Sequence, residues 1–317
     1  IIWINNILWF FSKKPQYIID PNDNPDIIED ERVSRTTYPN AWINITFGCN
    51  NFCTYCVVPY TRGIETSRPV EDVLKEARKL VSDGALELNL LGQNVNSYHG
   101  EDKNGKERNL AYLLRKISEI DGLERIRYTT SYPADMTDDL IACHHDLKKL
   151  MPYLHLPVQS GSDKILKAMN RRHSADDYKR IIDKLYEANP DLRMSSDFIV
   201  GFPGETYEDV KETLDVIRKV QFDNAFTFIY SKRTGTPAAG MDHQVDPKDI
   251  TGWVDEVLTL VQNCAKERTA MLAGRVEDVL VEDRNSHDAS LLTGRMSNNT
   301  LVHLPRDASL VAQTVTV

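Results

Sequence analysis

Three cysteines lie within eight positions of this 317-residue chain, at Cys49, Cys53 and Cys56, and their spacing suggests metal chemistry. A disulfide would pair two of them and leave the third alone. Structural zinc takes four ligands, usually as separated pairs, and the next candidates along the chain, His99 and Cys143, are far downstream. A 4Fe–4S cluster fits better, because three thiolates can hold three irons and leave the fourth open to another ligand. Two alternatives stay open: neighbouring cysteines without a metal, and a zinc site with distant partners.

The composition limits the classes of protein to which the chain can belong. It has a net charge of −9, 41% hydrophobic residues and five cysteines. So few cysteines in so long a chain do not form a disulfide scaffold, and we expect a cytoplasmic protein in a reducing compartment. No apolar run approaches the roughly 20 residues that span a bilayer, so we expect no membrane contact. The net negative charge argues against electrostatic binding of nucleic acid over a broad surface. It does not exclude a local basic patch.

The elements that must position the cysteines alternate along the chain. Near-continuous apolar or β-branched runs, typical of strands buried on both faces, occupy 42–47, 86–92, 125–131, 153–158, 193–201 and 224–230. Helical patterns occupy 69–84, 110–122, 174–189 and 206–220. Ser174 and Thr206 are good N-caps, each with an aspartate three positions on. Alternating strands and helices predict a parallel sheet with right-handed crossovers.

Six such units predict an α/β fold built as a partial, open (β/α)6 barrel over residues 40–246. Chemistry in barrels of this kind lies at the C-terminal ends of the strands, and the cysteine loop follows the first strand. Other strand ends carry small polar turns, namely "GQN" at 92–94, "QSG" at 159–161 and "GFPGE" at 201–205. Glycine there can serve tight turning alone. Three such turns on the rim that carries the cysteines favour a ligand pocket.

The last part of the chain has a different pattern. We expect a connecting helix over 247–273. Residues 274–317 alternate apolar and polar positions, with "SNN" as a hairpin turn, and predict a small all-β module. The pattern stops at Val317, so we expect the last strand to be incomplete.

Several motifs resemble those of one enzyme family. "CNNFCTYCVVPYTRG", with Tyr55 before the last cysteine, resembles the radical S-adenosylmethionine signature. "NLLGQNVNSYHG", "TTSYP", "LHLPVQSGSDKILKAMNRRH", "SSDFIVGFPGET" and "FTFIYSKRTGTPAA" resemble the methylthiotransferases, in particular the branch that acts on isopentenyladenosine beside the tRNA anticodon. The resemblance covers roughly residues 40–317, and the all-β module is similar to the TRAM domain of that family.

The resemblance implies how the site binds its cofactors. Cys49, Cys53 and Cys56 would hold one 4Fe–4S cluster, and S-adenosylmethionine would bind the open iron. One electron then breaks the sulfonium bond and yields a 5′-deoxyadenosyl radical. By family position, the cofactor-binding residues are Tyr55 at the adenine edge, Gly92, Gln93 and Asn94 near the methionine amino group, Gln159, Ser160 and Asp197 at the ribose or carboxylate, Ile199 and Gly201 under the adenine, and Arg233.

Some details depart from the family or stay undecided. The turn Gly92-Gln93-Asn94 departs from the Gly-Gly-Glu form common in the superfamily, which puts its side-chain roles in doubt. Arg62, Arg68 and Arg233 are candidates for contacting phosphate or stabilising the site, with a surface ion pair as an equal alternative.

The resemblance also implies partners: a tRNA substrate and an electron donor such as flavodoxin or ferredoxin, with the chain as a monomer. Family members carry an N-terminal domain with three further cysteines for an auxiliary 4Fe–4S cluster. Residues 1–40 contain no cysteine, and Cys143 and Cys264 fit helix packing better than a cluster. We therefore interpret the chain as a truncated member, with residues 1–39 as a domain remnant and linker.

Other functions stay open alongside this one. They are a methylthiotransferase of another branch, acting on another tRNA base or a ribosomal protein, a radical enzyme with one cluster, and a non-catalytic iron–sulfur RNA-binding protein.

Overall fold

The computed structural model describes residues 39–317. The interpretation of residues 1–39 as a domain remnant and linker therefore lies outside the described residues, apart from Pro39.

Six parallel strands form the centre of the fold, as two three-stranded sheets in the orders β1-β4-β7 and β10-β9-β8. A bridge between Ile126 and Leu150 joins them. The strands are β1 (Asn40–Asn44), β4 (Glu87–Leu91), β7 (Arg125–Tyr128), β8 (Tyr153–His155), β9 (Arg193–Val200) and β10 (Asn224–Ile229). The prediction of a partial, open α/β barrel is confirmed.

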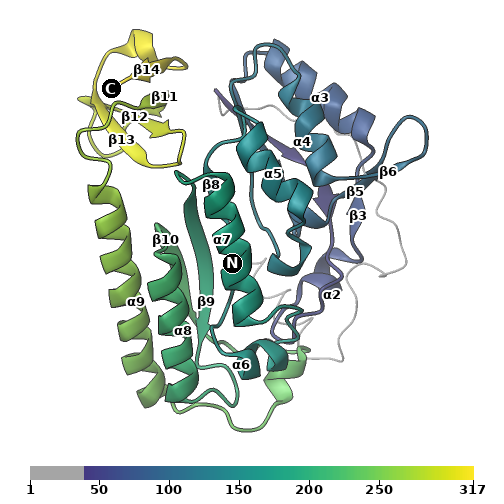
Figure 1. The fold of residues 1–317 in the computed structure, drawn as a ribbon, viewed down its shortest axis with the longest axis vertical. Coiled ribbons are helices and arrows are strands. Elements are labelled where there is room, and N and C mark those ends of the chain that lie inside the picture. The colour runs from purple at the N-terminus through teal and green to yellow at the C-terminus, as the bar shows by residue number, and fades with distance from the viewer. Residues whose placement is uncertain (1–38) are drawn as a thin grey trace, which may run out of the picture.

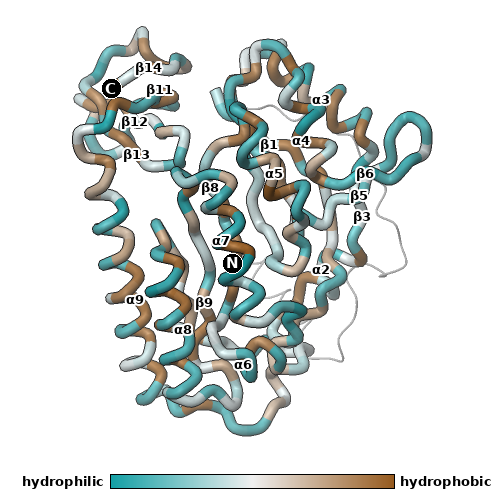
Figure 2. Tube along the Cα trace, in the orientation of Figure 1, coloured by the Kyte–Doolittle hydropathy of each residue, from teal (hydrophilic) through white to brown (hydrophobic). Residues whose placement is uncertain are grey.

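Helices pack against this sheet (Figure 1). They are α3 (Val70–Ser82), α4 (Leu110–Ser118), α5 (Asp138–Asp146), α7 (Ala175–Ala188) and α8 (Tyr207–Val220). Both predicted N-caps are present, since Ser174 and Thr206 form capping boxes with Asp177 and Asp209. Most buried apolar side chains of these helices and strands form one cluster. Figure 2 shows the apolar residues of the helices as brown segments that alternate with teal ones along each helix.

Some elements have no counterpart in the sequence prediction. They are α5, the short helix α6 (Asp163–Ala168) and a hairpin of β5 (His99–Glu101) with β6 (Glu107–Asn109). Their apolar patterns are too short to stand out. Two strands are also shorter than predicted. β7 ends at Tyr128, shortly before Thr130 takes a positive φ of 71°, and β8 ends at His155.

The predicted connecting helix and all-β module are both present. α9 (Pro247–Ala270) leads to an antiparallel sheet of four strands in the order β13-β12-β11-β14. These strands are β11 (Asp278–Arg284), β12 (Leu291–Met296), β13 (Leu301–Pro305) and β14 (Thr314–Thr316). The predicted "SNN" turn joins β12 to β13. Cys143 in α5 and Cys264 in α9 are buried, so the expectation that both pack within helices is confirmed.

Two buried arginines of β7 fix the all-β module to the barrel. Arg125 donates to the carbonyl oxygens of Arg295 (2.8 Å) and Asp278 (3.1 Å), and Arg127 donates to that of Met296 (3.2 Å). β7 begins at this end, whereas the cysteine loop follows the other end of the parallel sheet. The module and the cysteine loop therefore lie at opposite ends of the barrel (Figure 1).

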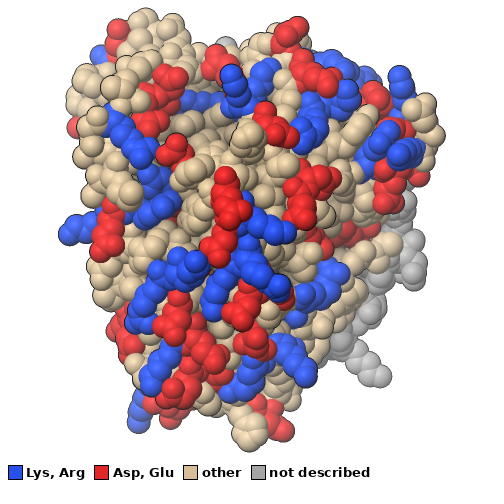
Figure 3. Space-filling model, in the orientation of Figure 1, with Lys and Arg blue, Asp and Glu red and all other residues tan. Residues whose placement is uncertain are grey.

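The outer helices carry mixed charge. They carry ion pairs between residues three positions apart in the sequence, such as Lys211–Glu208 (2.8 Å) and Arg218–Asp215 (2.8 Å). Figure 3 shows red and blue side chains interleaved on this face. Such exposed pairs add little stability. Within residues 39–317, no helix is both long enough and apolar enough to span a bilayer.

We predict that removing one partner of the buried ion pair between Arg127 and Glu87 destabilises the folded protein. Arg127 Nε lies 3.0 Å from Glu87 Oε1, and both side chains are at most 6% exposed. Arg127→Met should lower the free energy of unfolding by about 3 kcal/mol, because it leaves a buried carboxylate unpaired. The double variant with Glu87→Met should recover most of that loss. Urea unfolding measures both, with Arg218→Met on the surface as a control. Equal stability of the Arg127→Met and Arg218→Met variants would contradict this account.

Candidate active site

The cysteines lie on a closed loop at the end of the first strand. β2 (Thr46–Phe47) pairs with β3 (Thr66–Ser67), and this pairing ties the ends of the loop together. The loop turns sharply at Gly48, whose φ is +69° and where a Cβ atom would lie 2.1 Å from the carbonyl oxygen of Ile64. Only glycine fits there. A short helix, α2 (Val58–Arg62), completes the loop.

The three thiols are close enough to influence one another. Burial, with smaller contributions from the neighbouring Glu65, Cys53 and Cys56, raises the pKa of Cys49 to about 11. Burial likewise raises the pKa of Cys56, whose sulfur accepts a hydrogen bond from Val58 N–H at 3.5 Å. The free thiols of Cys49 and Cys56 are therefore protonated at neutral pH, and a metal that binds them must displace the protons.

The donor set fits an iron–sulfur cluster better than zinc. Among residues 39–317, no three His, Cys, Asp or Glu side chains converge closely enough to hold a single ion. His99 instead contacts Ser67, and Cys143 packs against the carbonyl group of Ala111. A cubane cluster separates its ligands by its own width, so three thiols spaced around one loop suit it.

The segment after α6 clamps the cysteine loop. Asn170 takes a left-handed conformation with φ of 58°, which ends the helix and turns the chain back toward the loop. Its side-chain amide donates to the carbonyl oxygens of Asn51 (3.3 Å) and Phe52 (3.1 Å). Just before it, Met169 accepts from Thr54 N–H at 3.1 Å. The loop is thus held along its length by backbone contacts.

Arg171 reaches one of the cysteines. Its Nη1 lies 3.7 Å from Cys53 Sγ, and its Nη2 donates to the carbonyl oxygen of Pro157 at 2.6 Å. The guanidinium group also lies over the ring of Tyr132, 4.2 Å from the centroid. The sequence prediction quoted this "NRR" run within a family motif but gave it no role. Two arginines directly after a helix-ending asparagine were the available signal.

Arg172 links the clamp to the turn after β4. It donates to Asn51 Oδ1 (2.7 Å) and pairs with Asp135 (3.2 Å), while Asn94 Nδ2 donates to the same carboxylate at 2.8 Å. Gly92 in this turn is tightly packed, since a Cβ there would lie 1.8 Å from a side-chain oxygen of Thr46.

The same turn supplies two polar atoms without partners. Within the described chain, Gln93 Oε1 and Asn94 Oδ1 are buried and find no hydrogen-bond donor. Both are acceptors that an ammonium group could satisfy. The structure therefore supports the prediction that this turn lies near the methionine amino group, without testing it.

The segment after β8 lies beside β9, the strand that contains Asp197 and Ile199. Gln159 N–H donates to the carbonyl oxygen of Asp197, and Ile199 N–H donates to that of Gln159, both at 2.9 Å. Ser160 is buried, and its hydroxyl oxygen accepts from Ser162 N–H at 3.2 Å. These residues are thus brought together as predicted, although the Ser160 hydroxyl is engaged within the protein.

A polar network missed by sequence reasoning lies beside Asp197. Ser195 Oγ contacts both Tyr153 Oη (2.8 Å) and His155 Nδ1 (2.7 Å). His155 Nε2 lies 3.6 Å from Asp197 Oδ1. The alternation of side chains along the parallel strands puts all four on one face of the sheet.

An apolar patch underlies the same rim. Tyr55 and Ile199 pack against a small buried cluster that is separate from the main core, made of Ile165, Met169, Phe202 and Ala238. Gly201, with φ of +79°, begins the next turn. Tyr55 and Ile199 therefore lie at one apolar patch, whereas a Cβ atom at Gly201 would lie 2.6 Å from the side chain of Ile250 in α9. The adenine site stays a prediction.

The three candidate arginines have different environments. Arg68 is buried and pairs with Glu76 at 2.6 Å, so the ion-pair alternative holds there. Arg62 is exposed at the end of α2. Arg233 is exposed. It lies near enough to the cysteine loop for its charge to lower the pKa of Cys56.

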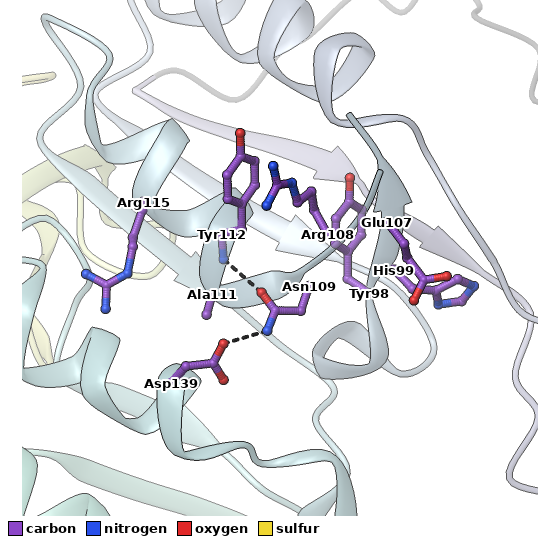
Figure 4. Close-up of a pocket in the computed structure, with 9 residues that line it drawn as sticks. All are labelled: Tyr98, His99, Glu107, Arg108, Asn109, Ala111, Tyr112, Arg115 and Asp139. Carbon is purple, nitrogen blue, oxygen red and sulfur yellow. Dashed lines mark hydrogen bonds between the residues drawn. The ribbon is translucent and has the colours of Figure 1, made fainter. Parts of the chain in front are cut away.

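A separate cavity of about 480 Å³ lies away from the cysteine loop, between the β5–β6 hairpin and α4 (Figure 4). Three of its charged groups already have partners: Arg108 pairs with Asp102 (2.8 Å), Arg115 with Asp146 (2.8 Å), and Asp139 accepts from Asn109 (2.6 Å). No cysteine lines this cavity, so we do not assign the iron–sulfur site to it.

Comparison with known families gives the same assignment. The profile described as "Radical SAM superfamily" matches residues 43–217, which include the cysteine loop and the strand-end turns. The chain belongs to the radical SAM superfamily. Membership implies a 4Fe–4S cluster and S-adenosylmethionine as cofactors.

Individual relatives show which members of the radical SAM superfamily this chain resembles. A tRNA-2-methylthio-N(6)-dimethylallyladenosine synthase of Thermoanaerobacter sp. (strain X514) is 46% identical over 98% of this chain and 66% of the relative. One of Paracoccus denitrificans (strain Pd 1222) is 54% identical over 77% of this chain and 55% of the relative. The chain thus spans 55% to 66% of the length of these two relatives. The resemblance to methylthiotransferases is confirmed.

Solved structures match at the level of the fold. One of them is a radical S-adenosylmethionine methyltransferase of Kitasatospora setae with cobalamin and a [4Fe-4S] cluster bound, at a TM-score of 0.51 and 17% identity. The match covers 63% of this chain and 38% of that one.

Glu205, which sequence reasoning mentioned only as part of a turn, is a buried acid of this rim. Its carboxylate accepts from Gly201 N–H (2.5 Å) and Phe202 N–H (3.2 Å) and so fixes the turn after β9. Burial raises its pKa to about 7, although the two backbone hydrogen bonds act in the opposite direction. The folded protein therefore keeps a proton that the unfolded chain releases near pH 4.5.

We predict a pH-dependent effect of Glu205 on stability. Its contribution should fall as pH rises from about 4.5 to 7, by up to about 3 kcal/mol, because the buried carboxyl must ionise. Glu205→Gln keeps an oxygen acceptor but cannot ionise. Its unfolding free energy relative to the wild type should therefore rise over this window. Glu205→Ala should be about 1–3 kcal/mol less stable than Glu205→Gln at every pH, since it leaves two buried N–H groups unpaired. A pH-independent difference between wild type and Glu205→Gln would refute the account.

Proposed function

We propose that this chain contributes the radical-generating and RNA-binding parts of a tRNA methylthiotransferase that acts on isopentenyladenosine beside the anticodon. The observation that carries the proposal is the loop with Cys49, Cys53 and Cys56 at the strand ends of a radical SAM fold. The names of the similar proteins support the substrate.

Each part of the rim has a distinct task in this proposal. Cys49, Cys53 and Cys56 hold three irons of the cluster. Gln93 and Asn94 offer buried acceptors to the methionine ammonium group. When bound, the cluster and S-adenosylmethionine supply one-electron reduction and a 5′-deoxyadenosyl radical.

The adenosine part of the cofactor takes the neighbouring turns. Gln159, Ser160 and Asp197 are proposed for the ribose or carboxylate, and the Tyr55 backbone for the adenine edge. Ile199 and Gly201 provide the apolar surface under the adenine, next to a cluster of buried side chains that excludes water. Arg233 stays a candidate for the same region.

The all-β module is proposed to act as a TRAM-like RNA-binding domain. Four antiparallel strands and local arginines are consistent with that role. Because the module lies at the opposite end of the barrel from the cysteines, a tRNA held by both must extend along the barrel. We further propose an electron donor such as flavodoxin or ferredoxin and a monomeric chain.

The proposal is tested by separating its half-reactions. Residues 1–317 contain two cysteines outside the loop, both buried in helices, so the chain tested alone should hold one cluster of close to four irons after anaerobic reconstitution. With a strong reductant it should release 5′-deoxyadenosine. It should leave isopentenyladenosine tRNA without a methylthio group, because the auxiliary cluster implied for sulfur delivery has no ligands here.

Mass spectrometry of the tRNA nucleosides and of the small products reads both half-reactions. Replacing any one of Cys49, Cys53 and Cys56 with alanine should abolish the cluster and 5′-deoxyadenosine together. Cys143→Ala in α5 is the matched control and should keep both. Zinc in the site, with no response to S-adenosylmethionine, would refute the proposal.

The RNA-binding role makes a separate prediction. Arg284 and Arg306 of the module are exposed. If they contact phosphates, replacing both with methionine should weaken tRNA binding and reduce the slope of log affinity against log salt by about one per arginine. Arg218→Met on α8 should change neither. If the tRNA affinity and the salt slope are both unchanged, Arg284 and Arg306 do not contact the RNA. Point substitution is preferable to deleting residues 274–317, because deletion would uncover the buried Arg125 and Arg127.

A further inference from the structure

Arg171 is a cation without a carboxylate partner in the part of the chain that the structure describes. Its side chain is half-buried, and its Nε atom is fully buried with no acceptor. Its neighbours are the sulfur of Cys53, the Pro157 carbonyl group and the face of Tyr132. By contrast, the buried Arg127 and Arg193 each have a carboxylate oxygen within 3.0 Å.

A partly buried charge without a counter-charge is unfavourable, so Arg171 requires an explanation. One carbonyl oxygen and one aromatic face do not neutralise it. The remaining contact is Cys53, which would be a thiolate when it ligates iron. A cluster with thiolate ligands is an anion, and it would lie on the side of Arg171 that now has a sulfur as its neighbour.

The orientation of Arg171 is fixed from several directions. The hydrogen bond to Pro157 holds one nitrogen of the guanidinium group, and the ring of Tyr132 supports its plane. Tyr132 is itself held, because its hydroxyl oxygen accepts from the backbone N–H of Arg172 at 2.8 Å. The guanidinium group is thus directed toward Cys53 before any cofactor binds.

We propose that Arg171 is the counter-ion of the iron–sulfur cluster and raises its reduction potential. This inference rests on the proposed function of the cysteine loop. Reduction adds a negative charge to the cluster, so a fixed positive charge and a hydrogen bond to a ligating sulfur favour the reduced state. Arg233, another cation near the loop, is exposed, and solvent screens its charge.

The test compares charge with geometry at position 171. Arg171→Met removes the charge, Arg171→Lys keeps it without the planar fork, and Arg172→Met removes contacts to the cysteine loop but spares the contact to Cys53. Each chain is reconstituted anaerobically, its iron is counted, and the reduced cluster is measured by electron paramagnetic resonance at a series of fixed potentials.

At a given potential, Arg171→Met should lower the ratio of reduced to oxidised cluster about tenfold, which corresponds to about 59 mV for a one-electron couple. Arg171→Lys and Arg172→Met should change the ratio much less. Full iron content with an unchanged ratio in Arg171→Met would overturn the inference. An equal loss in Arg172→Met would also overturn it, because loop packing would then explain the effect.

Failure to assemble the cluster also decides the question. If Arg171→Met binds no iron, retention of iron by Arg171→Lys supports the counter-ion, and loss of iron in both variants overturns it. A wild-type chain without a 4Fe–4S spectrum would instead refute the proposed function, so the two failures can be told apart.

Discussion

The rest of the site depends on the hydrogen bonds between the cysteine loop and the segment after α6. The loop has no regular structure around its thiols, and a loop of that kind keeps its shape only if its backbone groups find partners elsewhere. Asn170 and Met169 provide them from a turn more than a hundred residues downstream. The left-handed conformation of Asn170 makes this possible, because it redirects the chain from α6 toward the loop.

The polar contacts around the loop form a connected set. Asp135 joins Arg172, which holds the loop, to Asn94 in the turn after β4. A displacement of the loop would therefore reach the turn proposed for the methionine end of the cofactor. Preorganisation of this kind matters in radical chemistry, since the protein's contribution is to position the cofactor, exclude water and tune the potential.

The two ends of the barrel use arginine in different ways. At the end where the strands begin, Arg125 and Arg127 donate to backbone carbonyl groups of the all-β module and stabilise its docking. At the other end, Arg171 faces a sulfur and an aromatic ring. The first environment is complete within the chain, while the second is the one that we propose an anionic cluster completes.

The sequence by itself determined the six central strands, most of the helices, their order along the chain, and the loop that we propose as the cluster site. Strand and helix periods are local properties, and capping residues such as Ser174 and Thr206 mark helix starts without reference to the rest of the fold. The cysteine spacing is also local, so the loop was predictable as a cluster site.

Tertiary structure alone decided which distant residues surround that loop. Arg171 and Asp135 are separated from Cys53 in the chain by whole strands and helices, and no periodicity shows that they lie on one rim. It also decided that Arg68 is used in an ion pair with Glu76 and that the all-β module docks at the far end. The physical reason is that contact partners and desolvation depend on packing between elements, whereas sequence patterns report only the face that each element buries.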